Sequence, residues 1–200
     1  KPVRLDDVSD LVREQLFDVD LEGNDLNVWL YNTARLAISF GHVGVLVDAP
    51  KEGDKTRPYW VTYTPKDILG FRSEIVDGVR QLTQLRLLEQ VVEPDGKYGD
   101  KVVKQIRVLE RGRYEIHRKD DKKNEYKLFD EGEMSLKDKI PFAIAYSNRV
   151  GYYESRSPLY DIAELNLKHY QIQSDLDNIL HISSVPMLAV FGYPNADEIT

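Results

Sequence analysis

The residues best suited to catalytic chemistry are Glu125 and Lys127, in the sequence EYK, together with Asp95 upstream in PDG. A Pro-Asp followed by Glu-x-Lys is the pattern of a class of Mg²⁺-dependent nucleases, in which carboxylates bind the metal and the lysine stabilises charge on the phosphate. The same pattern arises by chance in a chain of which 30% of the residues are charged. The flanking RKDDKKNEYK is typical of a solvated hairpin tip, which we prefer, and the nuclease stays an alternative.

The other acidic and imidazole groups predict no metal site. Three acid pairs suit Mg²⁺ or Ca²⁺, but surface charge explains them without a ligand. These pairs are Asp6 with Asp7, Asp18 with Asp20, and Asp120 with Asp121. The four histidines are His42, His117, His169 and His181, and the last two are separated by ~18 Å along one predicted helix. We therefore expect no metal and no cofactor.

Composition excludes several classes of function. The net charge is -7, which argues against binding to the outside of DNA, since that needs a basic face. The chain has no cysteine, so disulfides, thiolate metal sites and cysteine nucleophiles are excluded. The basic run at 111–123 is interrupted by acids, and an exposed hairpin explains it better than contact with nucleic acid. No run of ~18 apolar residues is present, so we expect no transmembrane helix and no membrane partner.

Hydrophobic periodicity predicts an α+β fold in which helices come first and a central antiparallel meander follows. Apolar residues at three- and four-residue steps predict helices up to Gly41, with Asn24 or Asp25 as a cap for the second helix. Asp77 and Gly78 form the strongest hairpin signal in the chain. Alternating and apolar runs predict strands at 44–50, 59–65, 102–110, 113–117 and 140–148.

A long helix is predicted over 157–181, with Ser157 as N-cap and Pro158 in the first turn. Apolar residues recur along it at alternating steps of three and four, with one polar insertion, which is the spacing of a helix–helix seam. The seam consists of Ile162, Leu165, His169, Ile172, Leu176 and Ile179. We expect His169 to pack in the seam rather than to bind a ligand. The apolar run VPMLAVFGY then predicts a short strand.

The order of these elements resembles the portal proteins of tailed bacteriophages, especially a branch catalogued as a phage domain of unknown function. The similar stretches are YTPKDILGFRSEIVDGVRQLTQLRLLEQ, QIRVLERGRYEIHR and IPFAIAYSNRVGYYESRSPLYDIAELNLKHYQIQSDLDNILHISSVPMLAVFGY. In the last, an Ile-Pro strand, a loop, a small-Pro-Leu-x-Asp motif, a Leu-Asn-x-x-His helix and a Val-Pro strand follow one another. The resemblance covers about residues 20–193, and its specificity lies in the order of degenerate motifs.

The resemblance implies a structural subunit of a ring at the capsid vertex, not an enzyme. Residues 1–148 would form a wing-like domain, 149–182 a loop and the long stem-like helix, and 183–200 the start of a clip-like segment. The chain would then be a segment of a longer protein. The location implied is the virion, after assembly in the host cytoplasm.

The resemblance also implies partners. They are copies of the chain itself in a dodecameric ring, the large subunit of the terminase, the head-tail adaptor, the capsid protein, and double-stranded DNA that passes through the channel without sequence-specific binding. Polar side chains on the long helix would face this channel, where a net negative charge repels phosphate weakly and lets DNA slide. The candidates are Glu164, Lys168, Asp175 and Asp177.

Three alternatives stay open. A different virion adaptor or interaction module would use the seam to form a small closed oligomer. The long helix could also pack on its own sheet, because two heptads are too few to show that the seam is intermolecular. The third alternative is the Mg²⁺-dependent nuclease.

Overall fold

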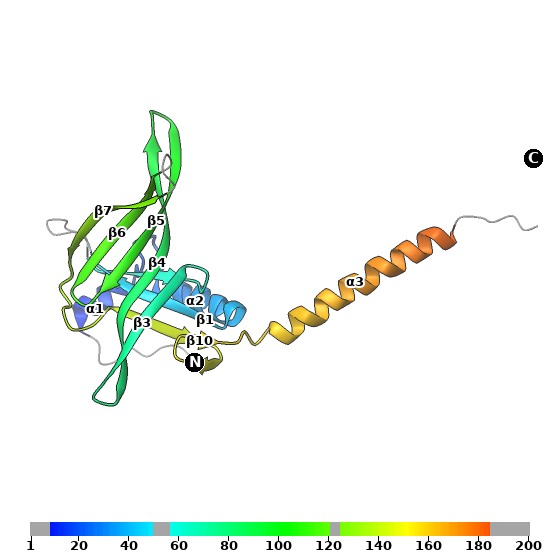
Figure 1. Ribbon diagram of the computed structural model, residues 1–200, viewed down its shortest axis with the longest axis horizontal. Helices are drawn as coiled ribbons and strands as arrows, with labels where there is room; N and C mark the ends of the chain where they lie inside the picture. Colours follow the sequence, from blue (N-terminus) through cyan, green and yellow to red (C-terminus); the bar gives the residue numbers. More distant parts are fainter. Residues whose placement is uncertain (1–8, 50–56, 121–124, 185–200) are drawn as a thin grey trace, which may run out of the picture. The chain divides into compact units, whose positions relative to one another are not determined.

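The computed structural model describes residues 9–49, 57–120 and 125–184 (Figure 1). They form an α+β structure, which confirms the predicted class: short helices come first, antiparallel sheets follow, and a helix comes last. The chain divides into two compact units, Lys1–Pro158 and Leu159–Thr200.

Two helices open the first unit, α1 (Asp10–Gln15) and α2 (Leu26–Phe40). α2 begins where the Val28 N–H donates to the Asp25 side chain at 2.8 Å, which satisfies one free amide of the first turn. It ends at Gly41, whose φ of 91° is a conformation that favours glycine. Both limits of α2 are as predicted, whereas α1 is shorter than the periodicity predicts.

The first sheet has three antiparallel strands in the order β2-β1-β8. β1 (His42–Asp48) lies between β2 (Tyr59–Tyr63) and β8 (Phe142–Tyr146). Against this sheet, the rings of Trp29 in α2 and Trp60 in β2 meet edge to face with centroids 4.8 Å apart. The pairing of β1 with β8 joins segments that are distant in the sequence.

The second sheet is a five-stranded antiparallel meander. Its strands are β3 (Ile68–Val76), β4 (Val79–Asp95), β5 (Gly99–Glu110), β6 (Arg113–Asp120) and β7 (Glu125–Glu133). Asp77 and Gly78 form the turn between β3 and β4 with positive φ values of 51° and 76°, which confirms the predicted hairpin. The β4–β5 hairpin projects beyond the other strands of its sheet (Figure 1).

The main core lies between the two sheets. Leu85, Leu87 and Leu109 of the second sheet are at most 2% exposed and cluster with Leu46 and Tyr63 of the first. Leu85 and Leu87 are two positions apart on β4, so they share one face of the strand, and Leu109 stands opposite Leu85 in register. Each fully buried leucine stabilises the fold by roughly 1.5–3 kcal/mol.

A small hairpin formed by β9 (Arg149–Gly151) and β10 (Glu154–Ser155) precedes the end of the first unit. In the second unit, α3 (Tyr160–Ser183) has 24 residues and is ~36 Å long. The predicted strand VPMLAVFGY lies outside the described residues.

The predicted start of the long helix is wrong. The residue that precedes its first turn is Leu159, not Ser157, and Pro158 lies outside the helix. The physical reason is that the Ser157 hydroxyl has another partner: it donates to the carbonyl of Ile38 at 2.9 Å. The segment before α3 is therefore bonded to the end of α2 rather than to the helix that follows.

We expect Leu85→Ala to lower the free energy of unfolding by about 2–5 kcal/mol, because the truncation leaves a cavity in the core between the two sheets. Val92→Ala is the matched control, since Val92 lies on the same strand but is 63% exposed. Its change should stay within about 0.5 kcal/mol. Urea denaturation followed by tryptophan fluorescence measures both, and equal losses would contradict the described core.

Candidate functional site

The residues of the nuclease pattern do not come together. Lys127 on β7 pairs with Arg118, and Arg118 pairs with Gln105 of β5. Asp95 pairs instead with Gly99 of β5. Gly99 and Gln105 are six residues apart on this strand, which is roughly 20 Å at ~3.3 Å per residue. Asp95 therefore cannot share a metal ion with the β7 residues, and the geometry contradicts the nuclease site.

The acid pairs within the described residues act in local structure. The Asp18 side chain accepts from the Gly23 N–H at 2.9 Å, and Asp20 accepts from the Glu22 N–H at 3.0 Å and from Asn24 Nδ2 at 2.8 Å. These bonds shape the turn between α1 and α2. Asp120 pairs with Glu125 across β6 and β7. Asp6, Asp7 and Asp121 lie outside the described residues.

The histidines occupy separate places. His42 begins β1, His117 lies on β6 with Nε2 at 2.9 Å from a Glu115 oxygen, and His169 and His181 lie on α3. Within the ranges that the structure describes, no group of three or more His, Asp or Glu side chains is placed to share a metal ion.

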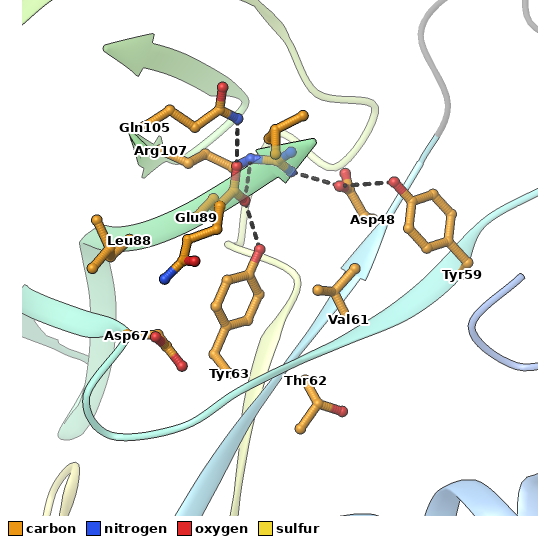
Figure 2. Close-up of a pocket in the computed structure, with 12 residues that line it drawn as sticks. Asp48, Tyr59, Val61, Thr62, Tyr63, Asp67, Leu88, Glu89, Gln105 and Arg107 are labelled. Atoms are coloured by element: carbon orange, nitrogen blue, oxygen red, sulfur yellow. Dashed lines mark hydrogen bonds and ion pairs between the residues drawn. The ribbon is translucent and has the colours of Figure 1, made fainter. Parts of the chain in front are cut away.

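A partly buried charge network joins the two sheets (Figure 2). Arg107 of β5 places its Nη1 at 2.6 Å from Asp48 of β1 and its Nε at 2.9 Å from Glu89 of β4. Glu89 also accepts from the hydroxyl of Tyr63 at 2.6 Å and from Nε2 of Gln105 at 2.7 Å. These residues line a hollow of about 390 Å³.

The electrostatics of this network favour a structural role. Burial, and then the Glu89 carboxylate, raise the pKa of Tyr63 well above its ordinary value. Burial acts to lower the pKa of Arg107, but the carboxylates of Glu89 and Asp48 outweigh it and raise that pKa. Near neutral pH the arginine therefore stays charged and the tyrosine stays neutral. Neither is suited to proton transfer, and the network works as a clamp between the sheets.

Sequence reasoning missed this clamp, although a signal for it was present. Glu89 continues the inward positions of β4 that begin with Leu85 and Leu87, and Arg107 occupies the inward position of β5 next to Leu109. Charged residues at core-facing positions of two neighbouring strands indicate a buried ion pair.

The predicted seam of α3 is exposed along its whole length. Every described side chain from 159 to 184 is exposed, including Ile162 at 63% and Ile172 at 67%. At roughly 100° per residue, the six seam positions fall within one stripe about 100° wide. An uncovered apolar stripe of this length is typical of an interaction surface.

A second apolar stripe lies on the opposite side of the first half of α3, and sequence reasoning missed it. Tyr160, Ala163, Leu167 and Tyr170 recur at steps of three and four. Their mean direction is roughly 170° from that of the seam, at about 100° per residue. Leu167 is 59% exposed and Tyr170 is 70% exposed. The helix therefore presents apolar side chains on two sides.

The four candidate channel residues divide between two polar flanks. Glu164, Lys168 and Asp175 follow one flank at steps of four and seven. Asp177 lies on the other flank, where it accepts a hydrogen bond from Nε2 of Gln173 at 3.0 Å. Residues two positions apart on a helix do not face the same way, so Asp175 and Asp177 cannot line one surface together.

Comparison with known protein families matches residues 158–200 to a phage-associated domain of unknown function, DUF4055. The described part of this match is α3 with its seam. No curated protein matches the chain. None of the described helices combines the length and the apolar character needed to span a membrane.

We expect Arg107→Met to lower the free energy of unfolding by about 1–3 kcal/mol, because it leaves the partly buried carboxylates of Asp48 and Glu89 without their cation. Arg113→Met is the control: its side chain is 53% exposed beside Glu115, so its loss should stay below about 1 kcal/mol. Chemical denaturation at neutral pH measures both variants. Similar small losses of unfolding free energy in the two variants would show that the clamp does not hold the sheets together.

Proposed function

We propose that this chain is a structural subunit of a phage portal ring at the capsid vertex. The ring forms the channel for genome packaging and ejection, and it is the docking site for the terminase and for the head-tail connector. One observation carries the proposal: the phage-associated match falls on a 24-residue helix whose apolar seam is wholly exposed.

The two stripes of α3 favour a ring over a small closed oligomer. A twofold dimer uses the same surface on both subunits, so one seam is sufficient. In a ring each subunit contacts one neighbour with one surface and the next neighbour with a different surface. The seam and the stripe containing Leu167 and Tyr170 supply two such surfaces, on opposite sides of one helix. The adaptor alternative leaves the second stripe unexplained.

The two polar flanks then have distinct places. If the stripes contact the neighbours on either side, one flank faces the axis of the ring and the other faces outward. We assign Glu164, Lys168 and Asp175 to the axis, because this flank carries more of the charge. Acidic groups there repel DNA phosphates weakly and do not hold them, which suits a channel through which DNA slides.

The remaining parts of the proposal follow from the resemblance. The first unit would be the wing on the outside of a dodecameric ring, in contact with the capsid protein. The segment after α3 would lead toward the region that docks the terminase large subunit and, later, the head-tail adaptor. Double-stranded DNA would pass through the axis without sequence-specific contacts.

Cysteine cross-linking tests the ring directly, because the chain has no cysteine of its own. In the full-length protein, Leu165→Cys combined with Leu167→Cys places one thiol on the seam and one on the opposite stripe. A ring contact joins these thiols between successive subunits, so oxidation should give a ladder of covalent trimers and larger species. Denaturing gel electrophoresis without reductant measures it.

The control variants separate the alternatives. Leu165→Cys alone should stay largely monomeric on the gel in a ring, whereas a twofold seam would give a covalent dimer from this single change. Glu164→Cys alone, on a polar flank, should not cross-link. Negative-stain electron microscopy should show rings with a central hole as wide as a DNA duplex. Dimers from Leu165→Cys, or small particles without a hole, would overturn the proposal in favour of the adaptor.

Charge reversal tests the assignment of the flanks. Asp175→Lys should slow DNA packaging in the assembled particle, because a lysine at the axis attracts the phosphates that must slide past it. Asp177→Lys, on the other flank, should have a much smaller effect. The packaging rate per motor is measured for both variants and tests which flank faces the axis. An equal effect of the two changes would contradict the flank assignment.

A further inference from the structure

The segment that leads into α3 is bonded to the C-terminal end of α2 by serine side chains. Ser147 donates from its hydroxyl to the carbonyls of Ala37 at 2.7 Å and Gly41 at 2.9 Å. Ser157 donates to the carbonyl of Ile38 at 2.9 Å. The Ala37 carbonyl also accepts from the Gly41 N–H at 2.7 Å, and the Gly41 carbonyl also accepts from the Ser147 N–H at 3.0 Å.

The contact is close as well as hydrogen-bonded. A Cβ atom at Gly41 would lie 2.5 Å from Ser155 Oγ and 3.0 Å from Ser157 N, so only glycine lets the two segments approach this far. Gly41 also has a φ of 91°, which itself favours glycine. The start of β1 and the segment 155–157 are therefore packed backbone to backbone.

His42 lies at the centre of this contact. Its side chain is 8% exposed, and its Nδ1 is 2.6 Å from Ser155 Oγ. In the neutral ring with an unprotonated Nδ1, the serine hydroxyl donates to that nitrogen. Ser155 is the ring's hydrogen-bond partner among the described residues, and it lies three residues before Pro158, the last residue of the first unit.

We propose that His42 and Ser155 form a proton-sensitive latch, which holds the segment leading into α3 against the end of α2 and opens when His42 is protonated. The protonated ring has two N–H donors and no acceptor, so the serine hydroxyl would have to turn and accept from Nδ1–H in place of donating to it. The charge would also be buried in a contact built for a neutral ring. The free-energy cost of burying the charged ring falls when the ring reaches water. That requires segment 155–157 to move away.

The surroundings supply little to stabilise the charged ring. From β8, Tyr146 stands opposite His42 in register with ring centroids 5.9 Å apart, and Arg149 lies over the Tyr146 ring at 5.2 Å. At the C-terminal end of α2, the carbonyls of Ala37 and Gly41 would attract a cation, but each already accepts from a backbone N–H and from the Ser147 hydroxyl. Burial is the cause that lowers the pKa of His42.

The direction of the pH effect follows. Because the pKa of His42 is lowered in the closed contact, the open form binds a proton more readily than the closed one. The latch is therefore fully closed above the ordinary histidine value of 6.5 and weakens as the pH falls below it. This makes the contact between segment 155–157 and the end of α2 sensitive to mildly acidic conditions.

Hydrogen exchange measured by mass spectrometry tests the latch. In the wild-type protein, exchange within residues 149–158, corrected for the intrinsic effect of pH, should be faster at about pH 5 than at about pH 7.5 by at least three-fold or so. His42→Asn should abolish this change, because the Asn side chain reaches the position of Nδ1 and cannot titrate. Ser155→Ala should exchange fast at both pH values.

Two controls keep the result interpretable. His117→Asn removes a histidine elsewhere on the sheet, beside Glu115, and should leave the pH effect unchanged. The contact between Trp29 and Trp60 lies in a different core, so its fluorescence should stay constant across these variants if the fold is intact. Exchange within 149–158 that does not change with pH, or a change that persists in His42→Asn, would overturn the latch.

Discussion

The position of one sheet on the other depends on the shared guanidinium of Arg107. The leucine cluster between the sheets supplies most of the favourable free energy, but apolar contact is non-directional and tolerates sliding. Arg107 is directional, because it must meet Asp48 on the first sheet and Glu89 on its own sheet at the same time. Leaving either partly buried carboxylate unpaired would be costly, so the charges select one arrangement from the many that would bury the leucines.

This arrangement in turn positions the end of the first unit. β8 pairs with β1, so once β1 is held by Asp48 the chain leaves β8 at a defined place. The turn after β9 is then held by its aromatic residues. Tyr153 has a positive φ of 61°, which is strained for tyrosine. Its ring packs against Phe71 at 4.6 Å and its N–H donates to the Tyr146 hydroxyl at 2.9 Å, which offsets that strain.

Local signals in the sequence predicted the parts of the fold that local chemistry determines. Asp25 and Gly41 set the limits of α2, and Asp77 with Gly78 formed the tightest hairpin, because caps and turns depend on a few adjacent residues. The class and the meander followed from alternation along the strands. The pairing of β1 with β8 could not be predicted this way, since it joins distant segments.

The errors about the candidate site also come from contacts between residues that are distant in the sequence. Ser157 has the type and place of a helix cap, but the carbonyl of Ile38, distant in sequence, competes for its hydroxyl. The nuclease pattern needs Asp95 near Glu125, and only the register of four strands shows that they are apart. The seam of α3 was visible in the sequence because it is periodic. The opposite stripe has the same three- and four-residue spacing as the seam but lies on the other side of the helix. A search for a single apolar face therefore does not find it.

The exposure of α3 has a consequence for how a ring could close. A helix with apolar side chains on two sides is poorly suited to water by itself, so covering both stripes links its stability to assembly by mass action. Surfaces of this two-sided kind form a ring only if each copy is rotated by the same closing angle, and otherwise they form open filaments.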